Sequence, residues 1–309
     1  MTAASPRLVD VILNHASGKA DKDPIAAKIP EVLHARGMQV RVYVARSTAE
    51  LLNSADRAAA GDAAIVAAGG GDGTVAAVAQ RLVNTDKALA VLPLGTFNYF
   101  ARRFDVPLDV DGALDVITAG VSSRIDVGEV NGRIFLNSAS IGLYSAVLER
   151  RETTFRALGR SRVVAYAVVA RSLIEPPALL NLRIEADGVP LARRTPLLFV
   201  GVNEYQMETF GIPGAGCLRT GRLASYITRP LGVFQMWRLA LRAFFRGLHG
   251  ANAFEVVCSR ELRVTMRRRR VRVAVDGEVL VLDTPLQFRL RPGALTVLAG
   301  PPSTKNTAA

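Results

Sequence analysis

The sequence predicts an α/β protein of two domains: an N-terminal domain with a parallel sheet covered by helices, and a β-sandwich-like C-terminal domain with inserted helices. At 309 residues the chain is longer than one hydrophobic core usually serves. In its first part apolar strands alternate with helical patterns, and from about residue 124 short strand-like runs replace that alternation. We therefore place the domains at 1–124 and 125–309, with the extreme C-terminus free to pack back on the first domain.

The first domain is expected to alternate strands and helices because parallel neighbours need a crossover connection. The predicted strands are 8–13, 40–44, 63–68 and 88–92, and the predicted helices are 25–36, 48–60, 74–83, 98–104 and 111–119.

The second domain is expected to be antiparallel because several of its runs alternate apolar and polar residues. The predicted strands are 125–130, 133–138, 180–186, 195–203, 222–228, 254–258, 260–266, 270–276 and 279–282, with helices near 141–151, 159–174 and 231–248.

The most informative segment is AAIVAAGGGDGTVA, residues 63–76. An apolar strand runs into three glycines, and Asp72, Gly73, Thr74 and small helix formers follow. Glycine lets the backbone approach a charged oxygen, and the N–H groups and dipole at a helix start favour an anion. We predict a phosphate-binding turn with Thr74 as the helix N-cap and Asp72 facing a metal ion or a hydroxyl. A tight βα turn without a ligand is the alternative that glycines alone leave open.

Two other phosphate motifs fit less well. The G-x-x-x-x-G-K-[ST] string of P-loop NTPases is absent from the sequence. The dinucleotide pattern G-x-G-x-x-G/A matches at Gly71, Gly73 and Ala76, but the next strand ends without the acidic residue that the pattern requires. The sequence therefore disfavours an NAD(H)-dependent dehydrogenase.

Two further strands end in similar turns. The strand 89–92 runs into Pro-Leu-Gly-Thr, with Asn98 one turn later, and the strand 8–13 runs into Asn-His-Ala-Ser-Gly-Lys. Because the carboxyl ends of parallel strands meet at one edge of a sheet, we expect the three turns to gather there.

These turns resemble the motifs of the diacylglycerol kinase catalytic family, bacterial lipid kinases related to sphingosine kinases and NAD kinases. The motifs occur in the family's order from residue 14 to residue 278. The matching residues are Asn14, Ser17 and Gly18; Gly70, Gly71, Asp72, Gly73 and Thr74; Pro93, Leu94, Gly95, Thr96 and Asn98; Phe135, Asn137, Ser140 and Gly142; and Asp276, Gly277 and Glu278.

The resemblance implies an NAD-kinase-like nucleotide domain that uses ATP with Mg²⁺ and transfers the γ-phosphate to a lipid hydroxyl, most directly that of diacylglycerol, giving phosphatidic acid. Asp276 is then the general base, with Glu278 beside it, and Asp72 acts through Mg²⁺. Asp276-Gly277 is also a β-hairpin turn signal, and both interpretations can hold together. The implied nucleotide-binding residues are Asn14, Ser17, Gly18, Gly70, Gly71, Asp72, Gly73, Thr74, Gly95, Thr96 and Asn98.

The chain departs from the family pattern at three positions. Phe97 replaces a glycine, Tyr99 stands where the family often has aspartate, and Thr220 stands where an aspartate helps to hold a structural magnesium. We therefore predict no second metal site. Two alternatives stay open: an NAD kinase, which shares Gly-Gly-Asp-Gly-Thr and an Asn-Glu pair such as Asn203-Glu204, and a catalytically impaired nucleotide- or membrane-binding relative.

The positive charge is confined to the second part of the chain. Residues 1–125 hold 13 basic and 13 acidic side chains, whereas residues 126–309 hold 26 basic and 14 acidic ones. We expect this part to meet an anionic membrane surface through Arg238, Arg242 and Arg246 of the helix 231–248; the alternative is that these arginines lie in water. The run 266–272 is expected to be an exposed or edge strand, and no nucleic-acid partner is predicted because no aromatic stacking set accompanies it.

The remaining features concern compartment and partners. Cys217 and Cys258 show no disulfide framework or metal spacing and are expected to be reduced. The sequence shows no signal peptide and no run of 18 uncharged apolar residues. We predict a cytoplasmic protein that associates peripherally with the inner face of the membrane and binds ATP and a lipid alcohol. A homodimer is compatible with the sequence.

Overall fold

The computed structural model describes residues 7–15, 22–158, 178–209, 215–230 and 254–301. The chain divides into two compact units, residues 1–127 with 292–309 and residues 128–291. Buried apolar side chains form a core in each unit. The predicted helices 159–174 and 231–248 lie outside the described residues.

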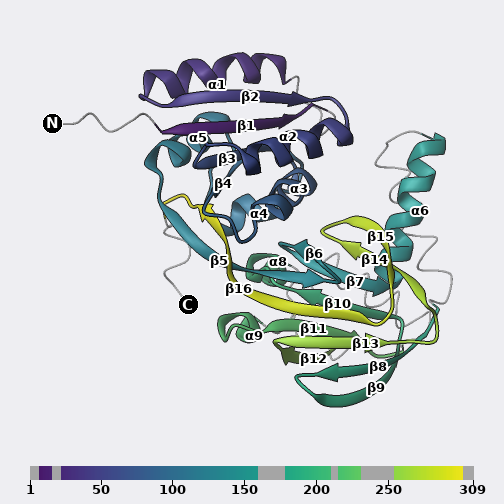
Figure 1. The fold of residues 1–309 in the computed structure, drawn as a ribbon. Helices are drawn as coiled ribbons and strands as arrows, with labels where there is room; N and C mark the ends of the chain where they lie inside the picture. Colours follow the sequence, from purple (N-terminus) through teal and green to yellow (C-terminus); the bar gives the residue numbers. More distant parts are fainter. Residues whose placement is uncertain (1–6, 16–21, 159–177, 210–214, 231–253, 302–309) are drawn as a thin grey trace. The chain divides into compact units, whose positions relative to one another are not determined.

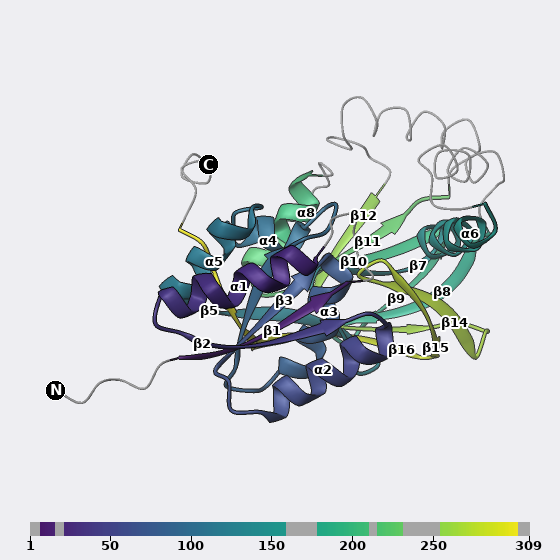
Figure 2. The same cartoon turned by 90° about the horizontal axis from the view of Figure 1, so that it is seen from above.

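Unit 1 contains a parallel sheet in the order β2, β1, β3, β4 (Figure 1). The end of β16 extends it, because Thr296 and Val297 pair in parallel with Ala88 and Leu89. Helices α1 and α5 pack together, as do α2 and α3 (Figure 2). The elements are β1 (Leu8–Asn14), α1 (Asp23–Ala35), β2 (Gln39–Ala45), α2 (Thr48–Ala60), β3 (Ile65–Gly70), α3 (Asp72–Leu82), β4 (Ala88–Pro93), α4 (Tyr99–Arg103), α5 (Val110–Ala119), β5 (Ser122–Val130) and β16 (Leu286–Leu298). The predicted parallel sheet is confirmed.

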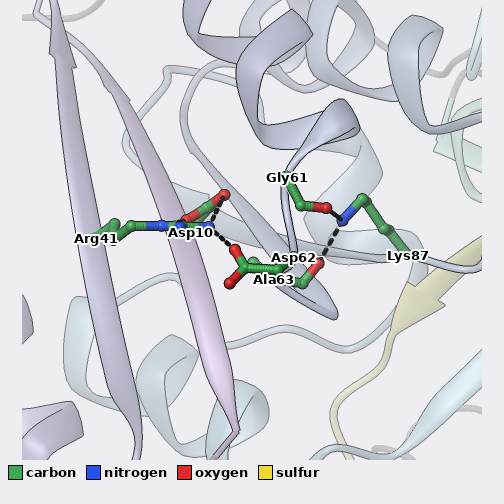
Figure 3. Close-up of polar contacts among 6 residues, drawn as sticks. All are labelled: Asp10, Arg41, Gly61, Asp62, Ala63 and Lys87. Carbon is green, nitrogen blue, oxygen red and sulfur yellow. Dashed lines mark hydrogen bonds and ion pairs between the residues drawn. The ribbon is translucent and has the colours of Figure 1, made fainter.

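A polar network ties β1 and β2 to the segments that precede β3 and β4 (Figure 3). Asp10 is fully buried and accepts from Arg41 Nε at 2.7 Å and Nη2 at 3.1 Å. Arg41 Nη2 also donates to Asp62 Oδ1 at 2.6 Å, and Lys87 Nζ donates to the carbonyls of Gly61 and Ala63 at 2.7 Å each. A buried carboxylate needs such a partner, so Arg41 is a structural residue.

Unit 2 consists of antiparallel strands in two sheets around a common core. One sheet has the order β16, β13, β8, β9, and the other has the order β12, β11, β10, β7, β14, β15. The core includes Leu182, Val200, Val273 and Phe288, which come from both sheets. The elements are β6 (Arg133–Phe135), β7 (Ser138–Gly142), α6 (Leu143–Leu158), β8 (Leu180–Ala186), β9 (Val189–Thr195), β10 (Leu197–Gly201), α8 (Glu204–Thr209), α9 (Ala215–Arg219), β11 (Leu223–Thr228), β12 (Phe254–Ser259), β13 (Glu261–Thr265), β14 (Arg270–Val275) and β15 (Glu278–Asp283).

Several strands of unit 2 differ from the prediction. The run 133–138 is broken at Leu136 and Asn137, so it forms β6 and the start of β7. Strands β9 and β16 were not predicted; β16 contains Pro292-Gly293, which reads as a break in sequence. The arginine run is not one strand, because β13 ends at Thr265 and β14 begins at Arg270, and β14 lies between β7 and β15 rather than at an edge.

The prediction of reduced cysteines is wrong. Cys217 in α9 and Cys258 in β12 form a disulfide, with a sequence separation of 41 and a Cα–Cα distance of 5.3 Å. Cys217 belongs to a second apolar cluster with Met207 and Tyr226, and exposed Cys258 pairs with Ala224 of that cluster in the β11–β12 ladder. The disulfide could not be predicted from the spacing of the two cysteines in sequence, because the fold, and not a local motif, brings α9 onto the β11–β12 ladder. Among the described helices, none combines the length and the apolar content needed to cross a membrane.

Candidate active site

The first candidate element is the turn between β3 and α3. Gly71 has an extended backbone, with φ −91° and ψ −178°, and its carbonyl accepts the N–H groups of Thr74 at 2.9 Å and Val75 at 3.1 Å. The helix therefore begins at Asp72, and its first amide N–H groups have no partner inside the helix. Together with the helix dipole, this end of α3 favours an anion.

The prediction that Thr74 is the N-cap is wrong, because Gly71 takes that position. Thr74 is buried as the third helical residue, and its Oγ1 accepts from Asn14 Nδ2 at 2.9 Å. A Cβ at Gly70 would lie 2.4 Å from the same Oγ1. Asn14 and Thr74 thus join the end of β1 to the start of α3, and only glycine fits beside them.

The turn after β4 is shaped by Asn98. This residue is buried, and its backbone adopts the left-handed conformation, with φ 52° and ψ 43°. Its Oδ1 accepts from Gly95 N at 3.1 Å, and its Nδ2 donates to the carbonyls of Pro93 at 3.2 Å and Gly95 at 3.1 Å. The amide therefore fixes the turn from within; its predicted contact to a nucleotide stays a prediction.

The two glycine turns meet backbone to backbone. A Cβ at Gly95 would lie 2.4 Å from the Cα of Gly71. The structure thus brings together the turns at 70–74 and 93–98, with Asn14 beside the first. Ser17 and Gly18, also predicted to bind nucleotide, lie outside the described residues.

Asp72 joins α3 to α4, because its Oδ1 accepts from Phe100 N at 3.0 Å. Mg²⁺ in substrate sites is usually held by one or two carboxylates together with substrate phosphates. Asp72 fits that role through its second oxygen. No cluster of three or more His, Cys, Asp or Glu side chains that could hold a metal ion occurs among the described residues.

Two positions at these turns are open. A Cβ at Gly73 would meet nothing within 4 Å in the part of the chain that the structure describes, so no described contact requires glycine there. Phe97 is 60% exposed, and its ring stacks on Tyr99 with centroids 5.5 Å apart and an interplanar angle of 4°. The departures from the family pattern at Phe97 and Tyr99 therefore form a stacked pair of one exposed and one half-buried ring beside Thr96.

Lys22 is a residue that sequence reasoning missed. It is fully buried, its Nζ donates to the carbonyl of Asn14, and burial lowers its pKa. In sequence it stands between two aspartates, a pattern that is typical of a charged side chain in solvent. Its place beside Asn14 makes it a cation at the edge of the sheet where the turns meet.

The second candidate element is the hairpin between β14 and β15. Asp276 has φ 46° and Gly277 has φ 89°, as the predicted Asp-Gly turn requires. The Asp276 carboxylate accepts the N–H groups of Leu136 at 2.7 Å, Asn137 at 2.8 Å and Ser138 at 3.0 Å. The hairpin is thus clamped to the break between β6 and β7, and exposed Glu278 begins β15. The clamp is a structural role; the predicted role as general base stays a prediction.

A buried amide pair supports the same segment. Asn203 Nδ2 donates to Asn137 Oδ1 at 2.7 Å, and both side chains are buried. Val202 N also donates to the carbonyl of Asn137 at 3.0 Å, and Asn203 Oδ1 accepts from Gln206 N at 3.3 Å at the start of α8. The Asn-Glu pair was visible in sequence, but its link through Asn137 to the Asp276 clamp was not, because it depends on the β10–β7 register.

The predicted membrane-facing residues Arg238, Arg242 and Arg246 lie outside the described residues. Thr220 follows α9, and its Oγ1 contacts the carbonyls of Gly216 at 3.1 Å and Cys217 at 2.9 Å. At this position the hydroxyl therefore ends a helix.

Comparison with known proteins shows what the part of the chain that contains these turns is similar to. Residues 9–130 match the family model described as the diacylglycerol kinase catalytic domain. The predicted family resemblance is confirmed. Over 197 residues, 62% of this chain, the sequence is 30% identical to the diacylglycerol kinases of Staphylococcus aureus strains bovine RF122 / ET3-1 and MRSA252. The matched part spans 61% of the length of each relative.

Solved structures agree in fold. Two crystal structures from Bacillus anthracis str. Sterne superpose with TM-scores of 0.74 and 0.72 at 23% and 22% identity, and the second is described as a diacylglycerol kinase. Each match covers 96% of this chain and 97% of the other. The likeness in fold thus extends over residues of both units, beyond the residues of the catalytic-domain match.

Proposed function

We propose that the protein is an ATP-dependent lipid kinase that transfers the γ-phosphate of ATP to a lipid hydroxyl, with diacylglycerol as acceptor and phosphatidic acid as product. The observation that supports this most strongly is the contact between the Gly71 and Gly95 turns at the start of α3, inside the residues that match the diacylglycerol kinase catalytic model. The turns supply closely spaced backbone at an anion-favouring helix end, which a polyphosphate needs.

In this proposal the protein mainly positions charge. Backbone N–H groups of the two turns hold phosphate oxygens, and Asp72 holds the Mg²⁺ that accompanies ATP and spreads the developing negative charge. The bond from the γ-phosphorus to the ADP oxygen breaks as the bond to the lipid oxygen forms. The hydroxyl proton passes to the Asp276 carboxylate, with Glu278 next to it.

Peripheral association with the inner face of the membrane belongs to the same proposal. Its support is the charge distribution, since residues 126–309 carry the whole excess of positive charge. A lipid acceptor lies in a bilayer, and arginine near anionic lipid contributes about 1 kcal/mol each to binding.

The experiment that tests the function is ATP consumption by the purified protein with a panel of diacylglycerol, a sphingoid base, other lipid alcohols and NAD. Mg²⁺-dependent ADP release with diacylglycerol supports the proposal. Turnover with NAD alone would make the protein an NAD kinase instead. ATP binding without turnover on any acceptor would indicate the catalytically impaired relative.

A further inference from the structure

A groove in unit 2 runs between the start of α6 and the β14–β15 hairpin. Helix α6 contacts both strands, and it lies beside them in both views of the fold (Figures 1 and 2). The groove has a volume of about 430 Å³. Its apolar lining comes from the helix, from β8 and from the hairpin: Leu143, Ala146, Val147, Leu180, Val271 and Val281.

The same groove carries an excess of positive charge. Arg150, Arg268, Arg270 and Arg272 line it, with Glu149 as its acidic lining residue. Two of the arginines have acidic neighbours: Arg272 Nε lies 2.8 Å from Glu149 Oε1, and Arg270 Nε lies 3.6 Å from Asp283 Oδ1. Both pairs are largely exposed to solvent, so each contributes little and can rearrange around an anion.

This combination selects among ligands. Inorganic phosphate would use the guanidinium groups but leave the apolar lining unused, and a neutral lipid alcohol would do the reverse. Guanidinium groups bind phosphate in bidentate fashion, and apolar side chains favour an acyl chain. We propose that the groove binds a lipid that already carries a phosphate group, with the phosphate at Arg268, Arg270 and Arg272 and the chain along Val271 and Val281. The groove shares the β14–β15 hairpin with Asp276, but neither Asp276 nor Glu278 lines it, and the proposal does not rest on the proposed transfer of phosphate.

Two matched pairs of variants test the two halves of the site. Arg268→Gln removes a lining charge, and Arg267→Gln removes the neighbouring charge, which lines a different pocket. Val281→Asp places a carboxylate at an exposed position of β15 that lines the groove. Val189→Asp places one at an exposed position of β9 that does not line the groove. The two variants of a pair change the net charge by the same amount, and both alter an exposed side chain. We therefore expect both variants to fold as the wild type does.

The measurement is calorimetric titration of the full chain with octyl phosphate below its micelle concentration, beside inorganic phosphate and octyl glucoside. We expect octyl phosphate to bind more tightly than either. Arg268→Gln should weaken it roughly fivefold, the ratio that corresponds to about 1 kcal/mol per arginine, and Val281→Asp at least as much, whereas the two controls keep the wild-type affinity. Equal loss within either pair, or equal affinity for octyl phosphate and inorganic phosphate, would overturn the proposal.

Vesicles then test the lipid itself. Phosphatidylcholine vesicles with and without phosphatidic acid are sedimented with wild type, Arg268→Gln and Arg267→Gln. The proposal expects phosphatidic acid to increase binding of wild type and Arg267→Gln more than binding of Arg268→Gln. An equal increase for all three would show that phosphatidic acid acts elsewhere on the chain and would overturn the assignment to this groove.

Discussion

At the scale of single residues, the glycines of the phosphate turns have different reasons to be glycine. A Cβ at Gly70 or Gly95 would collide with Thr74 or with the backbone of Gly71, whereas a Cβ at Gly73 would meet nothing within 4 Å. The first two are therefore required by packing. Among the described residues no packing contact requires glycine at position 73, so the approach of a phosphate to its backbone is the role predicted for it, and Gly73 is the sharpest probe of the turn.

We expect Gly73→Val to abolish most ATP turnover while the melting temperature stays near that of the wild type, because a Cβ at this position meets no described atom within 4 Å but the branched side chain blocks a phosphate. The measurement is ADP release together with thermal unfolding. Gly216→Val in α9 is the control, since its Cβ also meets nothing within 4 Å and it lies in unit 2. Wild-type kcat in Gly73→Val would show that the turn binds no phosphate.

We expect Asp276→Asn to lower kcat by ~10²–10⁴ with little change in the KM for ATP, as loss of a general base does. The clamp adds a second effect that the hairpin signal did not show. Asparagine has one acceptor oxygen, so one of the N–H groups at 136–138 would face an NH₂ group, which costs about 1–3 kcal/mol of stability.

Thr195→Val separates the two effects of Asp276→Asn. Buried Thr195 Oγ1 bonds the carbonyls of Leu197 and Thr228 at 2.7 Å each, so its loss also destabilises unit 2 without touching the clamp. If Thr195→Val lost as much activity at a similar melting temperature, the fall in Asp276→Asn would reflect stability, and the base role would fail.

Tyr226 predicts alkaline behaviour. It is buried, burial raises its pKa to about 12 from 10.0, and its hydroxyl has no hydrogen-bond partner in the part of the chain that the structure describes. The folded state holds the proton more tightly, so this contribution to stability is complete below pH 10 and is lost as the pH rises to 12. Chemical unfolding should show a loss of about 1.4 kcal/mol per pH unit in that range relative to Tyr226→Phe.

The phenylalanine variant gives a second check at neutral pH. Because it removes a buried hydroxyl without removing a hydrogen bond, Tyr226→Phe should be at least as stable as the wild type. A large destabilisation would mean that the hydroxyl has a partner in the folded protein, and the alkaline prediction would then need a smaller slope.

At the scale of elements, the sequence predicted unit 1 better than unit 2. Among the described residues of unit 1, strands β1 to β4 and helices α1 to α5 were expected within a few residues, because an apolar strand followed by an amphipathic helix is a strong local pattern. The end of β16, which adds a further parallel strand, was not expected. In unit 2 the pairing partners are distant in sequence. The β6–β7 break depends on Asp276, 138 residues after Ser138, and no local pattern encodes it.

The candidate site, too, was predictable from the sequence only in part. Sequence motifs located both glycine turns and the Asp276 hairpin, since these are short strings with fixed conformational needs. They did not show that Gly71 rather than Thr74 caps α3, that Asn98 bonds its own turn, or that Lys22 is buried beside Asn14. Each of these depends on how a side chain meets another element, which spacing alone does not determine.

The disulfide gives a prediction for α9 and β12. The disulfide closes a loop with a sequence separation of 41. In the chain-entropy model, this constraint raises the free energy of the unfolded chain by about 4 kcal/mol. We expect Cys217→Ala with Cys258→Ala to lower the free energy of unfolding by about 2–4 kcal/mol, measured in denaturant. Reductant should destabilise the wild type by a similar amount and leave the double variant unchanged; equal effects of reductant on both would contradict the bond.

At the scale of the whole molecule, charge distinguishes the two parts of the sequence. Residues 1–125 are balanced, and the net charge of +12 lies in residues 126–309. If that part docks on anionic lipid, binding to vesicles should grow with their anionic content. It should weaken as salt rises past physiological strength, where the Debye length is about 8 Å.

The test at this scale uses Arg238, Arg242 and Arg246, which recur every four residues in sequence and so share one face of the predicted helix. Replacing all three with glutamine should weaken vesicle binding by ~1 kcal/mol per arginine at most, about 3 kcal/mol in total. Turnover of a short-chain, water-soluble diacylglycerol should barely change, because these residues are outside the predicted phosphate turns. Co-sedimentation with vesicles of varied anionic content measures the first quantity and steady-state kinetics the second. Equal binding to neutral and anionic vesicles would leave the three arginines as a solvated face and favour NAD kinase, which has no reason to prefer a charged bilayer.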